Sequence, residues 1–93
     1  MDINKSVEAL RGIPGAVLAD VRTPEEYAEG HIPGSVNWPL ERLSAIDPDG
    51  DGPIFTYCMS GSRSARAAAH LQSRGYEAEN IGGIVTWNGE LER

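Results

Sequence analysis

The sequence predicts an α/β protein in which short parallel strands alternate with helices. Ala16–Ala19 and Ile54–Tyr57 are short apolar runs, a pattern typical of strands that are covered on both faces. Each run is followed by a segment with helical signals, one starting at Thr23 and the other covering Ala65–Gln72. Strands and helices that alternate in this way favour βα units around a parallel sheet.

Length and charge limit the classes of function. The 93 residues fit one domain, residues 1–93, with no repeat or linker, and no metal site or cofactor is expected. The net charge of −6 argues against nucleic acid as a partner. No apolar run approaches the ~20 residues of a membrane span, so no membrane partner is expected. The N-terminus lacks a signal-peptide core and the single cysteine suits a reducing compartment, so we expect a cytoplasmic protein.

The N-terminal quarter predicts two strands around a short helix. Met1–Ile3 is expected to form an edge strand, and Ser6–Arg11 one or two helical turns that stop at Gly12 and Pro14. The Ala16–Ala19 strand then ends at Asp20. Because ligands of open α/β sheets bind beyond the carboxyl ends of strands, Asp20 lies where a site is expected.

Thr23 begins a segment with several helix-start signals. Thr23 suits the N-cap, Pro24 the first helical position, and Glu26 the third position of a capping box, while Gly30 ends the helix. The chain continues with a turn, a brief strand and a short helical stretch, at 31–34, 35–38 and 40–43. The polar segment Asp47–Pro53 matches the opening of a calcium-binding loop, but strand-like residues follow where a helix is needed, which favours a solvated turn.

The C-terminal third predicts a helix, a strand and a closing helix. The first helix runs to Arg74, with Gly75 at its C-terminal cap. Small residues at helical spacing predict the face that packs on the sheet, with Leu71 on a flank: Ala65, Ala68, Ala69 and Gln72. The last strand, a turn and the closing helix are expected within 76–81, at 82–83 and within 84–91.

The only cysteine, Cys58, sits where the second apolar strand meets the long helix. The N–H groups of the first helical turn have no intrahelical partner and carry partial positive charge. Gly61 lets the backbone turn these groups inward, and Arg63 adds a permanent cation. A helix N-terminus contributes up to about 2 kcal/mol, which lowers a thiol pKa from about 8.5 to about 7. Arg63 and the loop amides would supply the rest, so a reactive thiol is favoured over a buried structural one.

Four segments together resemble the rhodanese-like sulfurtransferases. They are Asp20–Tyr27, Gly30–Ser35, Tyr57–Ser64 and Gly82–Ile84 with Trp87, and they span nearly the whole chain. The resemblance implies a three-layer α/β/α fold with a five-stranded parallel sheet. It also implies transfer of sulfane sulfur from thiosulfate, or another small anionic donor, through a cysteine persulfide. The acceptor would be cyanide, a thiol or a protein that takes up the persulfide sulfur.

The resemblance also implies roles for individual residues. Cys58 would be the nucleophile, Arg63 would clamp the sulfonate group, and Arg66 would assist. The backbone amides of the following residues would bind the persulfide: Met59, Ser60, Gly61, Ser62, Arg63 and Ser64. Asp20 is expected to hold this loop by hydrogen bonds, and Arg22 to pair with Glu26 or another neighbour. His31 is expected to be a structural, hydrogen-bonded histidine; His70 is expected to be solvent-exposed.

Two alternatives remain. Cell-cycle phosphatases and arsenate reductases on this scaffold use Cys-x5-Arg, whereas four residues separate Cys58 from Arg63 here and Ser64 occupies the arginine position. The shorter loop favours binding of a single sulfur. The other alternative is a non-catalytic or relay module that binds a partner protein and passes persulfide on, which an intact Cys58 does not exclude.

Overall fold

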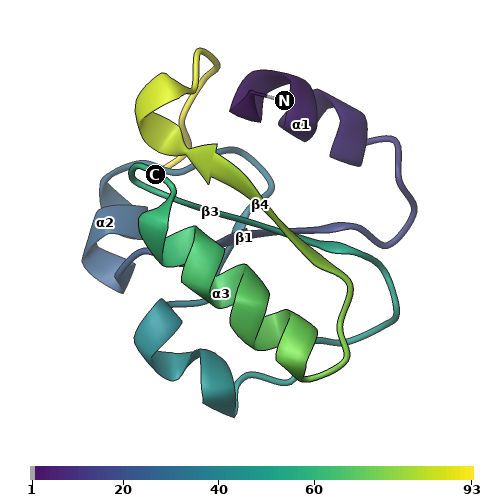
Figure 1. Cartoon of the computed structure of the whole chain (residues 1–93). Helices are drawn as coiled ribbons and strands as arrows, with labels where there is room; N and C mark the ends of the chain where they lie inside the picture. Colours follow the sequence, from purple (N-terminus) through teal and green to yellow (C-terminus); the bar gives the residue numbers. More distant parts are fainter. Residues whose placement is uncertain (1) are drawn as a thin grey trace.

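A four-stranded parallel sheet, with strand order β2-β1-β3-β4, forms the centre of the molecule (Figure 1). The computed structural model describes residues 2–93. In chain order the elements are α1 (Ile3–Leu10), β1 (Val17–Asp20), α2 (Pro24–Glu29), β2 (Val36–Asn37), η1 (Leu40–Ala45), β3 (Ile54–Cys58), α3 (Ser62–Ser73), β4 (Ala78–Gly83) and η2 (Ile84–Thr86). The elements η1 and η2 are short 3₁₀-helices. The parallel sheet and the strands expected from the apolar runs are confirmed.

The expected fifth strand at Met1–Ile3 is wrong for the residues that are described. The Asp2 carboxylate accepts a hydrogen bond from the Lys5 amide, and helix α1 begins at Ile3. Ile3, Val7 and Leu10 recur at helical spacing and are all buried, so burial of one helix face explains why this segment is not a strand. Met1 lies outside the described residues. The described sheet therefore has four strands where five were expected.

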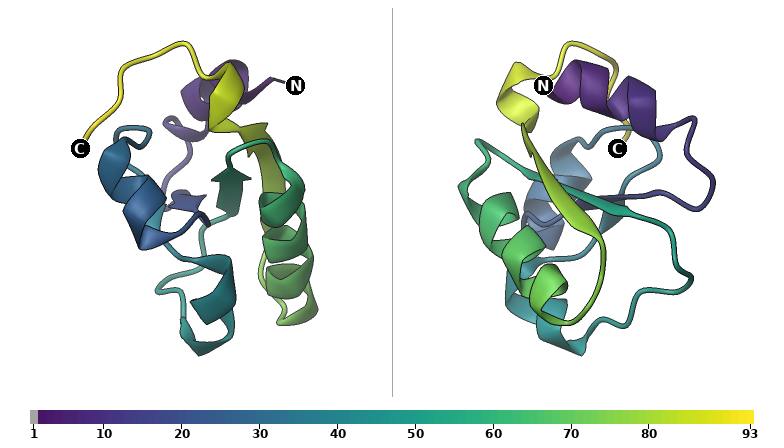
Figure 2. Two further views of the ribbon diagram at one scale, coloured as in Figure 1. Left: turned by 90° about the vertical axis from the view of Figure 1, so that its left-hand side faces the viewer. Right: turned by 45° about the vertical axis from the view of Figure 1, so that its right-hand side comes forward.

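Helices cover the two faces of the sheet in separate layers. The side chains of Leu18 and Tyr57 pack beneath α1, while Cys58 and its alternate neighbours on β3 face α3 and η1. Figure 2 shows α1 and α3 on opposite sides of the strands. Because side chains alternate along a strand, the register of β3 places the thiol of Cys58 on the α3 side. No helix within residues 2–93 is long and apolar enough to cross a membrane.

The buried face of α3 differs from the predicted one. Its buried residues are Ser64, Ala67, Ala68 and Leu71. Leu71, which was expected on a flank, is fully buried, whereas Ala65 and Ala69 are exposed. With alanine on every side, the helix gives little hydrophobic contrast from which its orientation can be predicted.

The C-terminal segment also departs from the expected turn and closing helix. Gly82 and Gly83 complete β4, and η2 is a single short turn at Ile84–Thr86. The chain then extends, and Glu92 forms an isolated antiparallel bridge with His31. The Asn88 amide is bonded to the Asn4 side chain, which ties this extended segment to α1. Tertiary hydrogen bonds therefore replace the expected helical ones.

The capping signals in the middle of the chain are confirmed. Thr23 and Glu26 form a capping box at α2, and Pro24 occupies the first turn. Residues 47–53 form an irregular loop, as expected. The α3 helix ends at Ser73, and Gly75 follows with a left-handed φ of +91°.

Candidate functional site

A loop at the carboxyl ends of the strands carries the cysteine. We call residues Cys58–Arg63 the Cys58 loop. The α3 N-cap is Gly61 with a φ of +110°, a left-handed conformation that favours glycine and turns the chain into the helix. Gly83 on β4 lies against the loop so closely that an added Cβ would be 2.3 Å from the Met59 carbonyl oxygen. The Val85 amide also donates to that oxygen, at 3.1 Å, so β4 and η2 position the loop.

Hydrogen-bond donors converge on the Cys58 sulfur. The amide of Gly61 lies 3.0 Å from Sγ and the amide of Ser64 lies 3.4 Å from it. The Ser64 hydroxyl is 3.3 Å from the same sulfur. Burial raises the pKa of the Cys58 thiol, but bonds from the Ser64 hydroxyl and from the Ser64, Gly61 and Ser60 amides outweigh burial and lower the pKa overall. The loop therefore lowers the pKa of the thiol, which is the direction expected from the sequence.

A side chain that the sequence interpretation missed, Asn80, organises these donors. Its Oδ1 lies 2.6 Å from the Ser64 hydroxyl, and its Nδ2 donates to the Gly61 carbonyl at 3.2 Å. Thr56 pairs with Asn80 whereas Tyr57 pairs with Gly82, so the register shifts at this point of β4. Such a bulge re-aims side chains, here directing Asn80 toward the loop. The sequence signal that could have identified Asn80 was its position near the carboxyl end of a predicted strand, where ligands of open α/β sheets bind.

Arg63 is held by Glu26. The guanidinium makes two hydrogen bonds to the carboxylate, with Nη1–Oε1 at 2.7 Å and Nη2–Oε2 at 3.1 Å. The hydrogen bond from Arg63 is the largest cause that lowers the pKa of Glu26 to about 2. The sequence identified Glu26 as a capping residue and as a candidate partner of Arg22; in the structure Glu26 caps α2 and pairs with Arg63. A guanidinium has five N–H donors, so Arg63 keeps donors for a second anion.

Asp20 and Arg22 form a buried pair. Arg22 donates from Nη2 to the Asp20 carboxylate at 2.6 Å, and from the same nitrogen to the Gly30 carbonyl at 2.8 Å. The expected pairing of Arg22 with a neighbour is confirmed, with Asp20 in place of Glu26. Within residues 2–93, the described hydrogen bonds of the Asp20 carboxylate all come from Arg22. The expected bonds from Asp20 to the Cys58 loop are therefore wrong.

The two histidines have different environments. His31 stacks on Tyr27, with ring centroids 3.7 Å apart, and its Nδ1 lies 2.9 Å from the Tyr27 carbonyl, which fits the expected structural role. His70 was expected to be exposed, but it is half-buried, and its Nε2 is buried with no hydrogen-bond partner within residues 2–93. His70 was misassigned because the predicted face of α3 was wrong.

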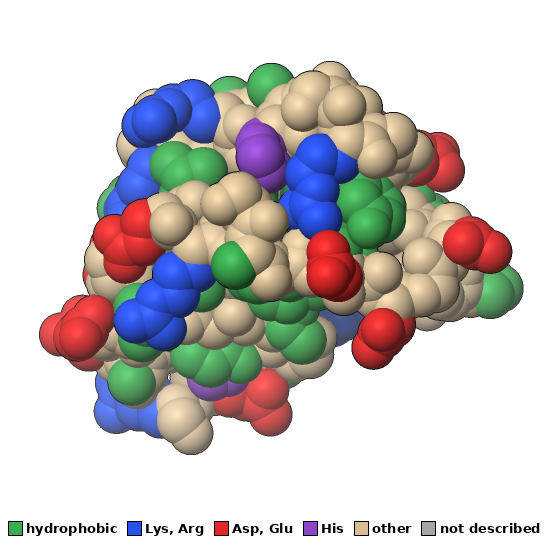
Figure 3. Space-filling view, turned by 90° about the horizontal axis from the view of Figure 1, so that it is seen from below, with side chains coloured by type: hydrophobic (Ala, Val, Ile, Leu, Met, Phe, Trp, Pro, Cys, Tyr) green, Lys and Arg blue, Asp and Glu red, His purple; other side chains and the backbone are tan. Residues whose placement is uncertain are grey.

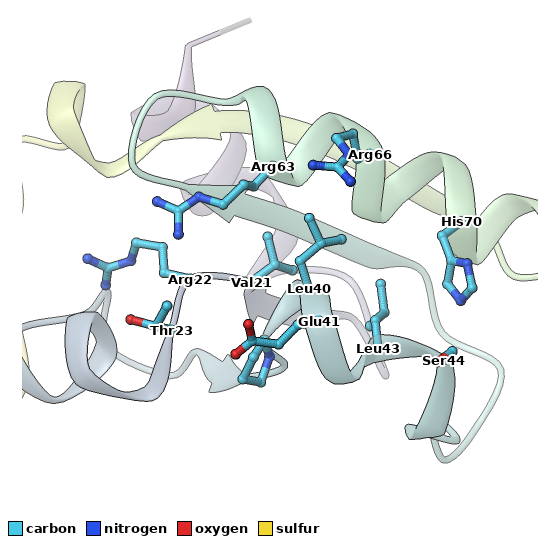
Figure 4. A pocket seen from close by; sticks show the side chains of 11 residues that line it. Val21, Arg22, Thr23, Leu40, Glu41, Leu43, Ser44, Arg63, Arg66 and His70 are labelled. Atoms are coloured by element: carbon cyan, nitrogen blue, oxygen red, sulfur yellow. The ribbon is translucent and has the colours of Figure 1, made fainter.

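Two cavities flank the Cys58 loop. The larger, which we call the α3 groove, has a volume of about 530 Å³ and lies between α3 and η1, with Arg63, Arg66 and His70 along α3 (Figure 4). The smaller has a volume of about 310 Å³ and is lined partly by Met59. Arg22 lines both cavities, and the Cys58 side chain lines neither. Seen from below, the molecule mixes hydrophobic side chains with charged groups of both signs (Figure 3).

The arrangement is suited to covalent chemistry at sulfur. A thiolate at a helix N-terminus, with amide donors already aimed at it, can attack an electrophilic sulfur and hold the negative charge that returns to it. The predicted residues Cys58, Gly61 and Ser64 meet in this structure, and Arg63 lies at the edge of the same loop. Arg66 lies one helical turn farther along α3, in the groove.

Comparison with known proteins gives a consistent result. The family model of the rhodanese-like domain matches residues 4–90. The chain is 37% identical over 93 residues to a sulfurtransferase of Allochromatium vinosum, covering 94% of this chain and 85% of that protein. It is 39% identical over 70 residues to the thiosulfate sulfurtransferase PspE of Escherichia coli, covering 70% of this chain and 67% of that protein.

A longer relative and two solved structures extend the comparison. The chain is 35% identical over 96 residues to the adenylyltransferase and sulfurtransferase uba4 of Ogataea parapolymorpha, covering 98% of this chain but only 25% of that protein. A rhodanese-like domain protein from Staphylococcus aureus superposes with a TM-score of 0.81 at 28% identity, over 99% and 94% of the two chains. A rhodanese with anions from Escherichia coli gives a TM-score of 0.71 at 31% identity, over 84% and 98%. By the extent of the family match and by these relatives, the chain belongs to the rhodanese-like domain family.

Proposed function

We propose that the protein is a sulfurtransferase that moves sulfane sulfur from thiosulfate, or another small anionic donor, to a thiol or cyanide. The observation that carries the proposal is the pair of backbone amides, from Gly61 and Ser64, aimed at the Cys58 sulfur. Amides fixed in this way stabilise negative charge on sulfur without reorganising during the reaction. Membership of the rhodanese-like family and relatives named as sulfurtransferases support the same chemistry.

In the first step the Cys58 thiolate attacks the outer sulfur of thiosulfate. A bond forms between Sγ and that sulfur, the S–S bond of thiosulfate breaks, and its electron pair leaves with sulfite. Arg63 contacts the sulfonate end through the donors that Glu26 does not use. The persulfide that remains on Cys58 occupies the anion-binding side of the loop, near the Gly61 and Ser64 amides.

The second step transfers the outer sulfur. A nucleophilic acceptor attacks it, the bond to Sγ breaks, and the electron pair returns to Cys58 as a thiolate. The donors that favoured the first attack then stabilise the leaving thiolate. One loop therefore serves both half-reactions, as covalent catalysis requires.

A coupled assay tests this proposal. Purified protein is mixed with thiosulfate and cyanide, and thiocyanate is measured by its coloured iron complex. We expect turnover by the wild type and none by Cys58→Ser, which keeps the size of the side chain but removes the nucleophile. Turnover by Cys58→Ser equal to that of the wild type would reject the mechanism.

A relay role is the second candidate, favoured by the uba4 comparison. There, a region similar to this chain makes up a quarter of a longer protein named as an adenylyltransferase and sulfurtransferase. In that role a partner protein would remove the sulfur, so the intact mass would show loading of Cys58 while the cyanide assay would show little turnover. With four residues between Cys58 and Arg63, we expect no hydrolysis of p-nitrophenyl phosphate.

A further inference from the structure

The α3 groove is longer than a small inorganic donor requires. Arg63 at one end belongs to the Cys58 loop, while Arg66 and His70 lie farther along α3 (Figure 4). At about 1.5 Å per helical residue, His70 lies roughly 10 Å beyond Arg63 along the helix axis. A thiosulfate ion at the Cys58 loop would leave most of this cavity empty. The groove therefore has room for a longer organic molecule.

The charge of the groove is opposite to that of the whole chain. Three arginines and one glutamate, Glu41, are among its lining residues, although the chain carries a net charge of −6. Arg22 and Arg63 are paired with Asp20 and Glu26. Within residues 2–93, Arg66 makes no described ion pair and the buried Nε2 of His70 has no hydrogen-bond partner. In that described range Arg66 is thus exposed and free of a described ion pair, and His70, four residues along the same helix, has a buried nitrogen without a partner; an anionic group between them would accept from the Arg66 guanidinium and from an N–H at His70 Nε2.

The floor of the groove is apolar and borders the core cluster that contains Cys58, although the Cys58 side chain does not itself line the groove. Val21, Leu40 and Leu43 line the groove. Val21 and Leu43 belong to the same core cluster as Cys58, and Leu40 packs against that cluster. A ligand that lies along this floor has an apolar stem between its anionic end and the end that approaches Cys58.

We propose that the α3 groove is the acceptor subsite, and that it binds an organic thiol whose carboxylate lies between Arg66 and His70. The proposal rests on the sulfur transfer proposed above. The thiolate of the acceptor attacks the outer sulfur of the Cys58 persulfide and forms a new S–S bond. The S–S bond to Cys58 breaks, its electron pair stays on Sγ, and the acceptor leaves as a persulfide.

Two acceptors that differ only at one end test the subsite. Persulfide-loaded protein is mixed with 6-mercaptohexanoate or 6-mercaptohexanol, and the rate of sulfur transfer to each is measured. We expect Arg66→Ala to reduce kcat/KM for the carboxylate by about tenfold, the scale of a hydrogen bond to a charged group, and to leave the alcohol unchanged. His70→Ala should also reduce kcat/KM for the carboxylate and leave that for the alcohol unchanged. Arg66→Lys should retain part of the activity on the carboxylate that Arg66→Ala loses.

The control removes a cation from the other layer of the molecule. Lys5 is exposed on α1, which covers the opposite face of the sheet from α3, so Lys5→Ala keeps the change in net charge but leaves the groove intact. It should alter neither rate. Circular dichroism of each variant checks that the fold is retained.

A non-reactive probe separates binding from chemistry. The S-methylated acid, 6-(methylthio)hexanoate, cannot accept sulfur, and its binding to unloaded protein is followed by NMR shifts of the His70 ring. We expect binding by the wild type and at least tenfold weaker binding by Arg66→Ala. Equal effects of Arg66→Ala on both thiols, or unchanged probe binding, would overturn the subsite. If the probe binds as expected but no thiol takes up sulfur, the proposed function fails and the acceptor role with it.

Discussion

At the residue scale, the reactivity of Cys58 depends on a competition between burial and hydrogen bonds. The side chain is 1% exposed, and burial alone would favour the neutral thiol. Donors from Gly61 and Ser64 reverse that preference. Ser64 has one hydroxyl proton, and four acceptors lie within reach of it: the Cys58 sulfur, Asn80 Oδ1, and the carbonyl oxygens of Gly61 and Gly82. Asn80 therefore influences how strongly Ser64 supports the thiolate.

The first prediction concerns this ionisation. The rate of alkylation of Cys58 by iodoacetamide should rise with pH at a midpoint below the value of about 8.5 for a free cysteine. Ser64→Ala removes the hydroxyl donor, so its midpoint should be higher than that of the wild type. Identical midpoints for the two proteins would mean that the Ser64 hydroxyl does not stabilise the thiolate.

The second prediction concerns Arg63. Arg63→Ala should lower kcat/KM for thiosulfate by about 1.5–3 kcal/mol, the usual scale of a hydrogen bond to a charged group. Its side chain is 33% exposed, so loss of the pair with Glu26 should lower the free energy of unfolding by only about 1 kcal/mol. Steady-state kinetics and urea unfolding measure the two quantities. An Arg63→Ala protein with full activity on thiosulfate would show that Arg63 does not contact the donor.

At the element scale, β4 determines the conformation of the Cys58 loop. The bulge in β4 directs Asn80 toward Ser64 and the Gly61 carbonyl, and Gly83 lies directly against Met59. Gly83 has an extended φ of −129°, a conformation that any residue adopts. Glycine is therefore needed here for close approach and not for its backbone freedom.

The third prediction tests this contact. In Gly83→Ala the new Cβ would lie 2.3 Å from the Met59 carbonyl oxygen and 2.6 Å from the Ser60 Cα, so the loop backbone must move. We expect sulfur transfer to fall at least tenfold and stability to fall by about 1–3 kcal/mol. The matched control is Gly12→Ala, whose Cβ would meet only the Ala9 carbonyl, at 3.6 Å. A Gly83→Ala protein as active and stable as this control would contradict the positioning role of β4.

At the scale of the whole molecule, the pair Arg63–Glu26 joins α2 to α3. The pair joins residues that follow two different strands, β1 and β3, and it lies next to the Cys58 loop. The pKa of Glu26 is lowered from 4.5 to about 2, with the Arg63 hydrogen bond as its largest cause. A carboxyl whose folded pKa is depressed stabilises the fold above its unfolded pKa and loses that contribution as pH falls toward the folded value.

The fourth prediction follows from the lowered pKa of Glu26, which makes the contribution of this carboxylate to stability depend on pH. The wild type should be more stable than Glu26→Gln above pH 4.5, and the difference should disappear as the pH falls toward about 2. Because a quarter of the Glu26 side chain is exposed, we expect a difference of only about 1 kcal/mol. Urea unfolding at a series of pH values measures it. A difference that stays constant from pH 7 to pH 2 would exclude this ionisation as its source.

Local signals predicted the fold better than they predicted the contacts of the site. The capping box at Thr23, the apolar strands and the glycine before α3 are adjacent-residue patterns, and the structure confirms them. The pairing of Glu26 with Arg63 joins residues 37 positions apart, and the contact of Asn80 with Ser64 depends on a bulge. The helix predicted within 84–91 is reduced to the short turn η2, because this segment makes hydrogen bonds to residues distant in the sequence, which outweigh its local helical propensity.

The most direct test of the central claim is the mass of the protein after exposure to thiosulfate. The proposed mechanism predicts that intact mass spectrometry will show a gain of one sulfur atom on the wild type, located on Cys58 by peptide mapping. Cyanide or dithiothreitol should remove it, and Cys58→Ser should not acquire it. A wild-type protein that gains no sulfur, or a Cys58→Ser protein that gains as much, would contradict sulfur transfer through a Cys58 persulfide.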